Sequence, residues 1–299
     1  MRLVTYTHAA ATRLGAMLDD THVVDIGRAS GGKLPPDMLA FLAAGDDAMA
    51  NARTAIDAAA AAARSGASAS GLIFALSDVA LEAPIVRPGK VLAIGLNYRD
   101  HAAEGGREIP KHPVVFAKMT GCITGPGKPI HRPKISSAVD WEGELCVVIG
   151  KRARHVAAAD AMQYVAGFMN GNDVSVRDWQ FHSPTWMMGK GFDTHGPTGP
   201  WLVTKDEVDA TNLELRTFVN GELKQHSNTK HLIFDIGAII EYITTPFTLE
   251  PGDIIFTGTP AGVGVARKPP EFLKAGDTVR IEIDGLGVLE NPVIEEPFG

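Results

Sequence analysis

From Pro84 onward, glycine and proline divide the sequence into short apolar runs, and this punctuation most constrains what the chain can fold into. Runs at 91–94, 114–117, 145–149 and 254–257 are short, rich in β-branched residues and bounded by turn-forming residues, as strands are. Asn220-Gly221 separates two strand-like flanks and favours a type I′ turn, which predicts a hairpin. A sheet-dominated core is therefore predicted for this part of the chain.

The amino-terminal quarter has a different pattern. Short runs at 2–6, 13–18 and 22–25 predict a small meander of strands, and the alanine- and leucine-rich stretch 36–64 predicts a helix. The sequence RSGASASG then predicts a flexible connection. We therefore predict an α+β, β-rich chain with a small amino-terminal α+β domain at 1–75 and a sheet-dominated domain at 76–299. Two further helices are predicted at 157–164 and 233–243.

Composition excludes several classes of function. The formal net charge is -7, and the basic residues form no cluster that would attract nucleic acid. No stretch approaches the roughly 20 apolar residues of a membrane-spanning helix, and the start lacks the pattern of a secretion signal. Only Cys122 and Cys146 are present, and both are predicted to be buried thiols. We expect a cytoplasmic protein that binds neither nucleic acid nor a membrane.

Acidic residues alternate at the start of one apolar run, in DWEGELCVVI. Glu142 and Glu144 would project from the same face of a strand, where two like charges are unfavourable unless a cation or a proton joins them. An equally open alternative is that both face solvent at a sheet edge. Asp173 offers a third carboxylate, although an isolated aspartate is more often a helix cap or a turn residue. Three carboxylates favour Mg²⁺ or Mn²⁺, with Ca²⁺ also possible, over zinc.

Two further spacings suggest functional pairs. His101 and Glu104 are three residues apart, which brings their side chains together on a helix; the alternative is an exposed histidine with an incidental neighbour. A carboxylate that binds one imidazole nitrogen makes the other a better base. Arg177 and Gln180 follow Asp173 at spacings that place all three on one helical face beside the ion. The alternative for Arg177 is a surface ion pair, for example with Asp178.

Five strings resemble, in order and spacing, the successive motifs of the fumarylacetoacetate hydrolase family: IGLNYRDHAAE, DWEGELCVVIGK, NDVSVRDWQ, GKGFDTHGPTGPWLVTKDEV and PGDIIFTGTPAGVG. They span about residues 90 to 290, and NDVSVRDWQ, SNTKHLIF and RKPPEFLKAGD are most similar to the branch of fumarylacetoacetate hydrolase domain-containing protein 2. The resemblance implies that 76–299 is the catalytic domain, with a mixed β-sandwich roll core, and that the chain forms a homodimer.

The resemblance also implies roles for individual residues. Glu142, Glu144 and Asp173 would hold the metal, and only these three, because a fourth ligand position of some members is Ile94 here. His101, Glu104 and Lys190 would be catalytic, and Arg177, Gln180 and Thr259 would contact the substrate. Without the resemblance, Lys190 would be interpreted as a solvated loop lysine and Thr259 as a turn residue.

The function implied is chemistry on small 2-keto acids through a metal-bound enolate. The leading hypothesis is a hydrolase that cleaves a carbon–carbon bond in acylpyruvate-type diketo acids. The same site would also suit an oxaloacetate tautomerase or decarboxylase, or an isomerase of a catabolic 2-keto or 2-hydroxy-dienoate. A noncatalytic scaffold stabilised by a metal is the alternative of another class.

Overall fold

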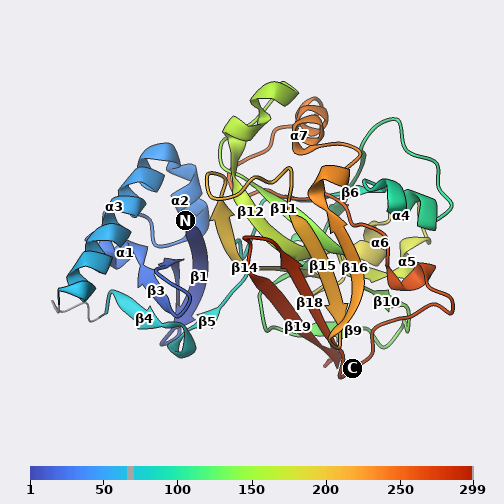
Figure 1. Ribbon diagram of the computed structural model, residues 1–299, viewed down its shortest axis with the longest axis horizontal. Helices are drawn as coiled ribbons and strands as arrows, with labels where there is room; N and C mark the ends of the chain where they lie inside the picture. The colour runs from blue at the N-terminus through green and yellow to red at the C-terminus, as the bar shows by residue number, and fades with distance from the viewer. Residues whose placement is uncertain (66–70, 298–299) are drawn as a thin grey trace.

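A long mixed sheet extends through the computed structural model, which describes residues 1–65 and 71–297 (Figure 1). Its strand order is β4-β3-β2-β1-β14-β12-β11-β17-β6-β7, with β5 beside β1 and β8 beside β14. The strands are β1 (Arg2–His8), β2 (Ala11–Met17), β3 (His22–Asp25), β4 (Ile73–Ala75), β5 (Ala80–Leu81), β6 (Val91–Gly95), β7 (Val114–Lys118), β8 (Ile123–Thr124), β11 (Gly143–Ile149), β12 (Val165–Asn172), β14 (Gly196–Thr204) and β17 (Ile254–Phe256).

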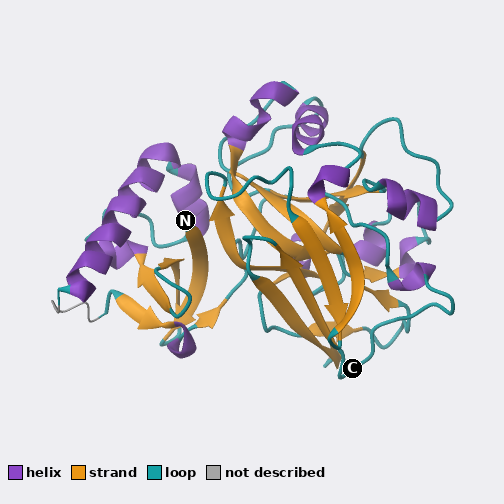
Figure 2. Cartoon of the chain, in the orientation of Figure 1, coloured by secondary structure: helices purple, strands orange, loops and turns teal. Residues whose placement is uncertain are grey.

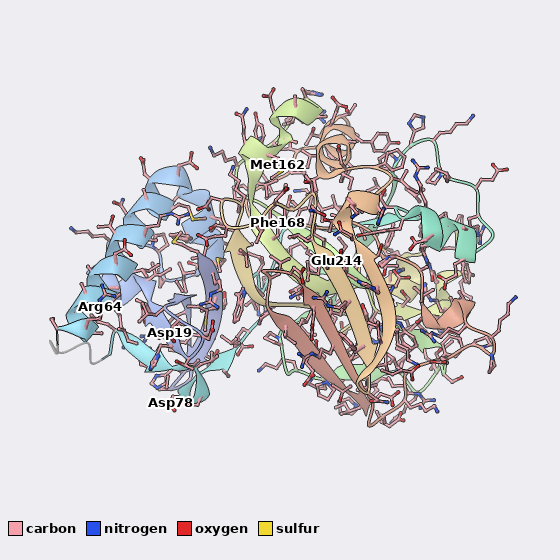
Figure 3. All side chains as sticks on the ribbon, viewed as in Figure 1. Asp19, Arg64, Asp78, Met162, Phe168 and Glu214 are labelled. Atoms are coloured by element: carbon pink, nitrogen blue, oxygen red, sulfur yellow. The ribbon has the colours of Figure 1, made fainter. Side chains whose placement is uncertain are left out.

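A second sheet packs against the first and completes a sandwich. Its order is β16-β15-β18-β19-β9, from strands β9 (Ile130–Arg132), β15 (Glu214–Val219), β16 (Glu222–Asn228), β18 (Thr278–Ile283) and β19 (Val288–Glu295). Leu145 and Val147 of β11 are buried in one cluster with Phe168 of β12, Leu215 of β15 and Ile283 of β18; Figure 3 labels Phe168. Apolar residues of both inner faces therefore form the core, which confirms the predicted β-rich α+β sandwich.

The amino-terminal meander is confirmed, and it continues the long sheet because Leu3 of β1 lies opposite Leu202 of β14. The single helix predicted at 36–64 is wrong. It is two helices, α2 (Met38–Ala43) and α3 (Gly45–Arg64), since Gly45 has a φ of 73°, which no helix interior accommodates. Both lie on one side of these strands (Figure 2), after the short α1 (Ile26–Ala29). Residues 66–70 of the Ser/Gly segment lie outside the described residues, and the boundary near 75 stays a prediction.

The strands predicted after Pro84 are present as β6, β7, β11 and β17. The hairpin is also confirmed: Asn220 and Gly221 have φ values of 53° and 80°, as a type I′ turn requires. The helix predicted at 157–164 is a 3₁₀ helix, η3 (Ala158–Tyr164). The helix predicted at 233–243 is α7 (Ile236–Thr244), which begins later because the side chain of Asp235 caps it by accepting from the Ala238 N–H at 2.8 Å.

Short elements gather at one end of the sandwich, where Figure 1 shows α4, α5, α6 and β10 close together. They are α4 (Arg99–Glu104), α5 (Arg177–Gln180), α6 (Met187–Lys190) and the paired strands β10 (Val139–Asp140) and β13 (Ser175–Val176). The remaining 3₁₀ helices are η1 (Leu76–Asp78), η2 (Thr120–Cys122), η4 (Thr229–His231) and η5 (Gly264–Ala266). Both cysteines are buried, as predicted. In the described ranges, no helix has the length and apolar character that crossing a bilayer requires.

Candidate active site

The register of two neighbouring strands brings the predicted metal ligands together. Gly143 of β11 lies opposite Asn172 of β12, so Glu142 directly before β11 and Asp173 directly after β12 are adjacent. The Asp173 N–H donates to the Glu142 carbonyl at 2.9 Å, and the Glu142 N–H donates to the Asn172 side chain at 3.0 Å. Carboxylate oxygens of Glu142, Glu144 and Asp173 lie within 4.8 Å of one another, and all three residues are buried. The alternative that the two glutamates face solvent is therefore wrong.

Buried cations neutralise part of this acidic cluster. Glu142 forms ion pairs with Arg177 at 2.7 Å and with Lys190 at 2.8 Å. Asp173 is paired through one oxygen with Lys190 at 2.8 Å and through the other with Lys118 at 2.5 Å. Lys190 is only 2% exposed, so its interpretation as a solvated loop lysine is wrong. Lys190 bridges two of the three carboxylates.

Glu144 differs from its neighbours because it has no cationic partner within the part of the chain that the structure describes. It accepts a hydrogen bond from the Gly258 N–H at 2.7 Å. Burial, followed by the charges of Asp173 and Glu142, raises the pKa of Glu144 well above its usual value. Burial also opposes ionisation of Glu142, but Lys190, Arg177 and His101 lower its pKa to about 2. The cluster therefore holds one carboxyl group that no cation of the described residues pairs with, and its all-oxygen donor set fits a hard divalent cation.

Replacing Glu144 with glutamine tests this fit. At free Mg²⁺ or Mn²⁺ concentrations ~100-fold above the dissociation constant, the free energy of unfolding of the wild type should rise by about 2 to 3 kcal/mol. Glu144→Gln should lose this rise. The metal-free variant should be at least as stable as the wild type, since glutamine resembles the protonated acid that burial favours. Scanning calorimetry with and without metal measures both effects. Glu290→Gln is the control, because the Glu290 side chain on β19 is 52% exposed. An unchanged metal response in Glu144→Gln would exclude Glu144 as a ligand.

The predicted base and its partner are in contact. His101 and Glu104 lie on α4, with His101 Nδ1 at 3.4 Å from Glu104 Oε2 and with side chains only 16% and 21% exposed. The Gly262 N–H donates to both oxygens of Glu104, at 2.9 and 3.1 Å. Buried Asn97 fixes the loop before α4 by donating to the carbonyl of Thr257 at 2.7 Å. The histidine therefore has a carboxylate partner that is itself anchored, and it is not an isolated exposed residue.

Arg177 and Gln180 form the two ends of α5, and Arg177 Nη1 donates to Gln180 Oε1 at 3.0 Å. The predicted helical face shared with Asp173 is wrong, because strand β13 separates Asp173 from α5. A surface ion pair between Arg177 and Asp178 is also wrong. Arg177 is only 6% exposed, and its Nε donates to Asp140 at 2.7 Å. Its Nη2 is buried without a hydrogen-bond partner among the described residues.

Close packing of α6 on α5 places Lys190. A Cβ on Gly189 would overlap the backbone of Gln180, so only glycine allows this approach. Thr259 lies across the site, where its hydroxyl donates to the Gly143 carbonyl at 2.9 Å and accepts from Gln225 Nε2 at 2.7 Å. The hydroxyl of Thr259 thus ties the loop after β17 to β11.

One cavity of about 380 Å³ joins these groups, and every predicted site residue lines it: His101, Glu104, Glu142, Glu144, Asp173, Arg177, Gln180, Lys190 and Thr259. Apolar side chains of Phe116, Trp186 and Val263 form other parts of the wall, and Ile94 lines it at the position without a metal ligand. The His101–Glu104 pair, a set of cations and a candidate metal site thus share one cavity. The individual roles of these residues stay predictions.

Sequence reasoning missed two residues of this network. Lys118, at the end of β7, is 3% exposed and donates to Asp173 and to the main-chain oxygen of Lys190. Asp140 is fully buried and accepts from Arg177 and from the N–H groups of Gly264 and Val265, at 2.7 and 2.9 Å. A signal for Asp140 was present, since it continues the alternation of Glu142 and Glu144.

The fold and the cavity together define a class: an enzyme with a β-sandwich core and a buried acidic cluster that fits a divalent cation. Residues 90–294 match the family described as fumarylacetoacetate (FAA) hydrolase, C-terminal. An oxaloacetate tautomerase of Xenopus laevis, described as mitochondrial, is 44% identical over 300 residues, which are 98% of this chain and 90% of that protein. The chain therefore belongs to the fumarylacetoacetate hydrolase family.

Solved structures agree with this assignment. A fumarylacetoacetate hydrolase from Exiguobacterium antarcticum is 31% identical with a TM-score of 0.82, covering 99% of this chain and 100% of that one. A 5-carboxymethyl-2-hydroxymuconate delta-isomerase from Mycobacterium smegmatis is 35% identical with a TM-score of 0.77, also covering 99% and 100%. Relatives with nearly full coverage thus have different names, and the family alone does not fix the reaction.

Proposed function

We propose that this protein is a divalent-metal-dependent tautomerase that interconverts the keto and enol forms of oxaloacetate or a closely similar 2-keto acid. The observation that carries the proposal is the single cavity in which the His101–Glu104 pair faces the same space as the carboxylate cluster. The oxaloacetate tautomerase of Xenopus laevis, which matches nearly the whole chain, supports this choice of reaction.

Glu142, Glu144 and Asp173 would hold the metal. A bound divalent cation supplies Lewis-acid polarisation of the 2-keto group and lowers the energy of negative charge on its oxygen. The chain contributes cations of its own beside this position. Lys190 contacts Glu142 and Asp173 at 2.8 Å, so its ammonium is fixed where an oxygen that gains charge would be stabilised.

His101 is the proposed general base. When Nδ1 carries the proton and donates to Glu104, Nε2 is left as the proton acceptor. In the keto-to-enol direction, Nε2 takes a proton from C3, the electrons of that C–H bond form the C2–C3 double bond, and the electron pair of the C=O double bond moves to the oxygen. The imidazolium then gives its proton to that oxygen, which leaves the enol and the neutral imidazole. The reverse reaction returns a proton to C3. Glu104 stabilises the imidazolium that exists between the two transfers.

Arg177 is the proposed anchor for the carboxylate next to the keto group. Its Nε and Nη1 are held by Asp140, Glu142 and Gln180, so the guanidinium has one orientation. The buried and unpartnered Nη2 remains able to donate to a ligand, and burying such a group is costly unless it finds an acceptor. A bound carboxylate would supply that acceptor.

Carbon–carbon hydrolysis, the leading hypothesis from the sequence, stays a prediction. The relatives support its alternatives more, because the Xenopus relative is named a tautomerase and the Mycobacterium smegmatis relative an isomerase. Hydrolysis would require His101 to activate a water molecule, whereas tautomerisation requires only proton transfer to and from the substrate. The same side chains are used in both reactions.

Ultraviolet assays with Mg²⁺ or Mn²⁺ distinguish these reactions. We expect the protein to accelerate the change in enol absorbance of oxaloacetate without forming a new product. Pyruvate and carbon dioxide would instead indicate decarboxylation, and pyruvate and a free acid from acylpyruvates would indicate hydrolysis. Tight metal binding without turnover of any of these substrates would contradict the enzymatic proposal and favour the scaffold.

The cytoplasmic location and the homodimer also stay predictions. The Xenopus relative is described as mitochondrial, so cell fractionation would decide between the two compartments. Light scattering coupled to size-exclusion chromatography would determine the oligomeric state.

A further inference from the structure

Arg107 is a charged residue of the cavity that neither the predicted mechanism nor the ion-pair network uses. It follows Gly105-Gly106 at the end of α4, and its N–H donates to the Ala102 carbonyl at 2.8 Å. Its side chain is exposed, lines the cavity, and forms no ion pair within residues 1–65 and 71–297. Arg107 is therefore a cation in the cavity whose charge is not neutralised.

The other arginine of the cavity has a contrasting environment. Arg177 is buried and paired with Asp140 and Glu142, both at 2.7 Å, next to the carboxylate cluster. Arg107 and Arg177 thus present two guanidinium groups to one cavity, of which only Arg177 is paired with protein carboxylates. A guanidinium binds a carboxylate through two parallel hydrogen bonds, which makes an unpaired arginine a specific receptor for that group.

The wall of the cavity that does not belong to the carboxylate cluster is mainly apolar. Leu96, Phe181, Trp186, Val263 and Val265 line it together with Arg107. These side chains offer no acceptor for the guanidinium, so the Arg107 guanidinium stays available to a ligand. A dicarboxylic ligand whose keto end lies at the cluster would bring its second negative charge to this wall.

We propose that Arg107 binds the second carboxylate of a dicarboxylic 2-keto acid and so selects diacids over monoacids. The proposal rests on the proposed function, because it assumes that the 2-keto end occupies the carboxylate cluster. The backbone next to Arg107 is suited to this role, because Gly106 has a φ of 62°, which L-residues rarely adopt, and the chain therefore turns sharply just before the arginine. Arg107 is thus a specificity-determining residue on the segment that carries the base.

Enzyme kinetics give the first test. Arg107→Gln should lower kcat/KM for oxaloacetate by about 10- to 100-fold, the effect of losing hydrogen bonds to a charged group. Pyruvate has only one carboxylate, so it offers no group for Arg107 to bind. Its inhibition constant in the same reaction should therefore change by less than about twofold, as for a substitution away from the contacts of a ligand. Arg107→Lys should recover part of the loss, because it keeps the charge without the planar fork. Lys111→Gln is the matched control, since Lys111 is exposed on the same segment but does not line the cavity.

Calorimetry of the Mg²⁺-loaded protein gives a second test that does not depend on turnover. The wild type should bind 2-oxoglutarate, a 2-keto diacid, more tightly than pyruvate, and Arg107→Gln should remove this preference. Equal weakening of both acids in Arg107→Gln, no weakening of either, or no binding of either acid by the wild type would overturn the proposal. If the wild type binds both acids but does not tautomerise oxaloacetate, the proposed function fails while the role of Arg107 is still measured.

Discussion

Replacing His101 with alanine is expected to lower kcat for oxaloacetate tautomerisation by about 10²- to 10⁴-fold, the usual contribution of a positioned general base. The imidazole of His101 lies beside the candidate metal site. Its Nδ1 is 3.4 Å from a carboxylate oxygen of Glu104, which leaves Nε2 to act as the base. Its removal leaves the carboxylate cluster intact. Metal affinity, measured by calorimetry, should therefore stay close to that of the wild type while turnover is lost.

Two further variants make this result specific. His112 lies on the same connecting segment, and its ring stacks on Tyr242 with 5.9 Å between the ring centroids. His112→Ala should leave kcat within about twofold of the wild type, because surface substitutions generally have small effects. Glu104→Gln should reduce kcat less than His101→Ala, because an amide still accepts hydrogen bonds from Nδ1 and from the Gly262 N–H. A kcat for His101→Ala near that of the wild type would show that another group transfers the proton.

The parts of this site that the sequence predicts are those in which the partners are neighbours along the chain. Alternation along a strand places Glu142 and Glu144 on one face, and helical spacing brings His101 next to Glu104. Both relations depend only on local backbone geometry. The strands near residues 91 and 254 and the Asn220-Gly221 hairpin are also local, and the structure has them where the sequence predicts them.

Contacts between distant segments are different. The convergence of Asp173 on Glu142 depends on the register of Gly143 opposite Asn172, which the family resemblance implied but local spacing does not set. Lys118 is separated from Asp173 by 55 positions and ends an apolar strand, so its sequence neighbours give no sign of an ionic partner. Asp140 contacts the Gly264 N–H across 124 positions. These partners are determined by sheet order, and sheet order is a property of the whole fold.

The break at Gly45 shows the opposite limitation. Composition between 36 and 64 favours helix throughout, since alanine and leucine dominate, and the sequence therefore predicts one element. A single glycine with a φ of 73° divides it and turns α3 away from α2. Buried alanines such as Ala52 and Ala59 show that α3 packs closely on its neighbours, so the turn is fixed by tertiary contacts. Propensity is a weak guide where packing determines the course of the chain.

Lys118 is expected to contribute more to stability than any single surface ion pair. Its side chain is fully buried, and its ammonium contacts Asp173 at 2.5 Å and the main-chain oxygen of Lys190. Burial opposes the charge on Lys118, but the adjacent Asp173 raises its pKa, so the lysine is ionised. Lys118→Met removes this charge and leaves part of the acidic cluster uncompensated. The free energy of unfolding of the metal-free protein should fall by about 3 to 5 kcal/mol, the cost of breaking a buried pair.

A double-mutant cycle separates the lost ion pair from a general packing defect. Asp173→Asn alone leaves Lys118 without its carboxylate, so it should also destabilise the protein, whereas the two substitutions together should cost less than the sum of the single effects. Denaturant unfolding at one protein concentration measures each free energy. The control is Lys128→Met. The ammonium of Lys128 lies 3.4 Å from Glu82, and 43% of the Lys128 side chain is exposed. Removing this surface ion pair should lower the free energy of unfolding by at most about 1 kcal/mol. Additive losses in the double variant would show that Lys118 acts by filling space. The ionic link through Lys118 between Asp173, a predicted metal ligand, and the loop of Lys190 would then have no energetic role.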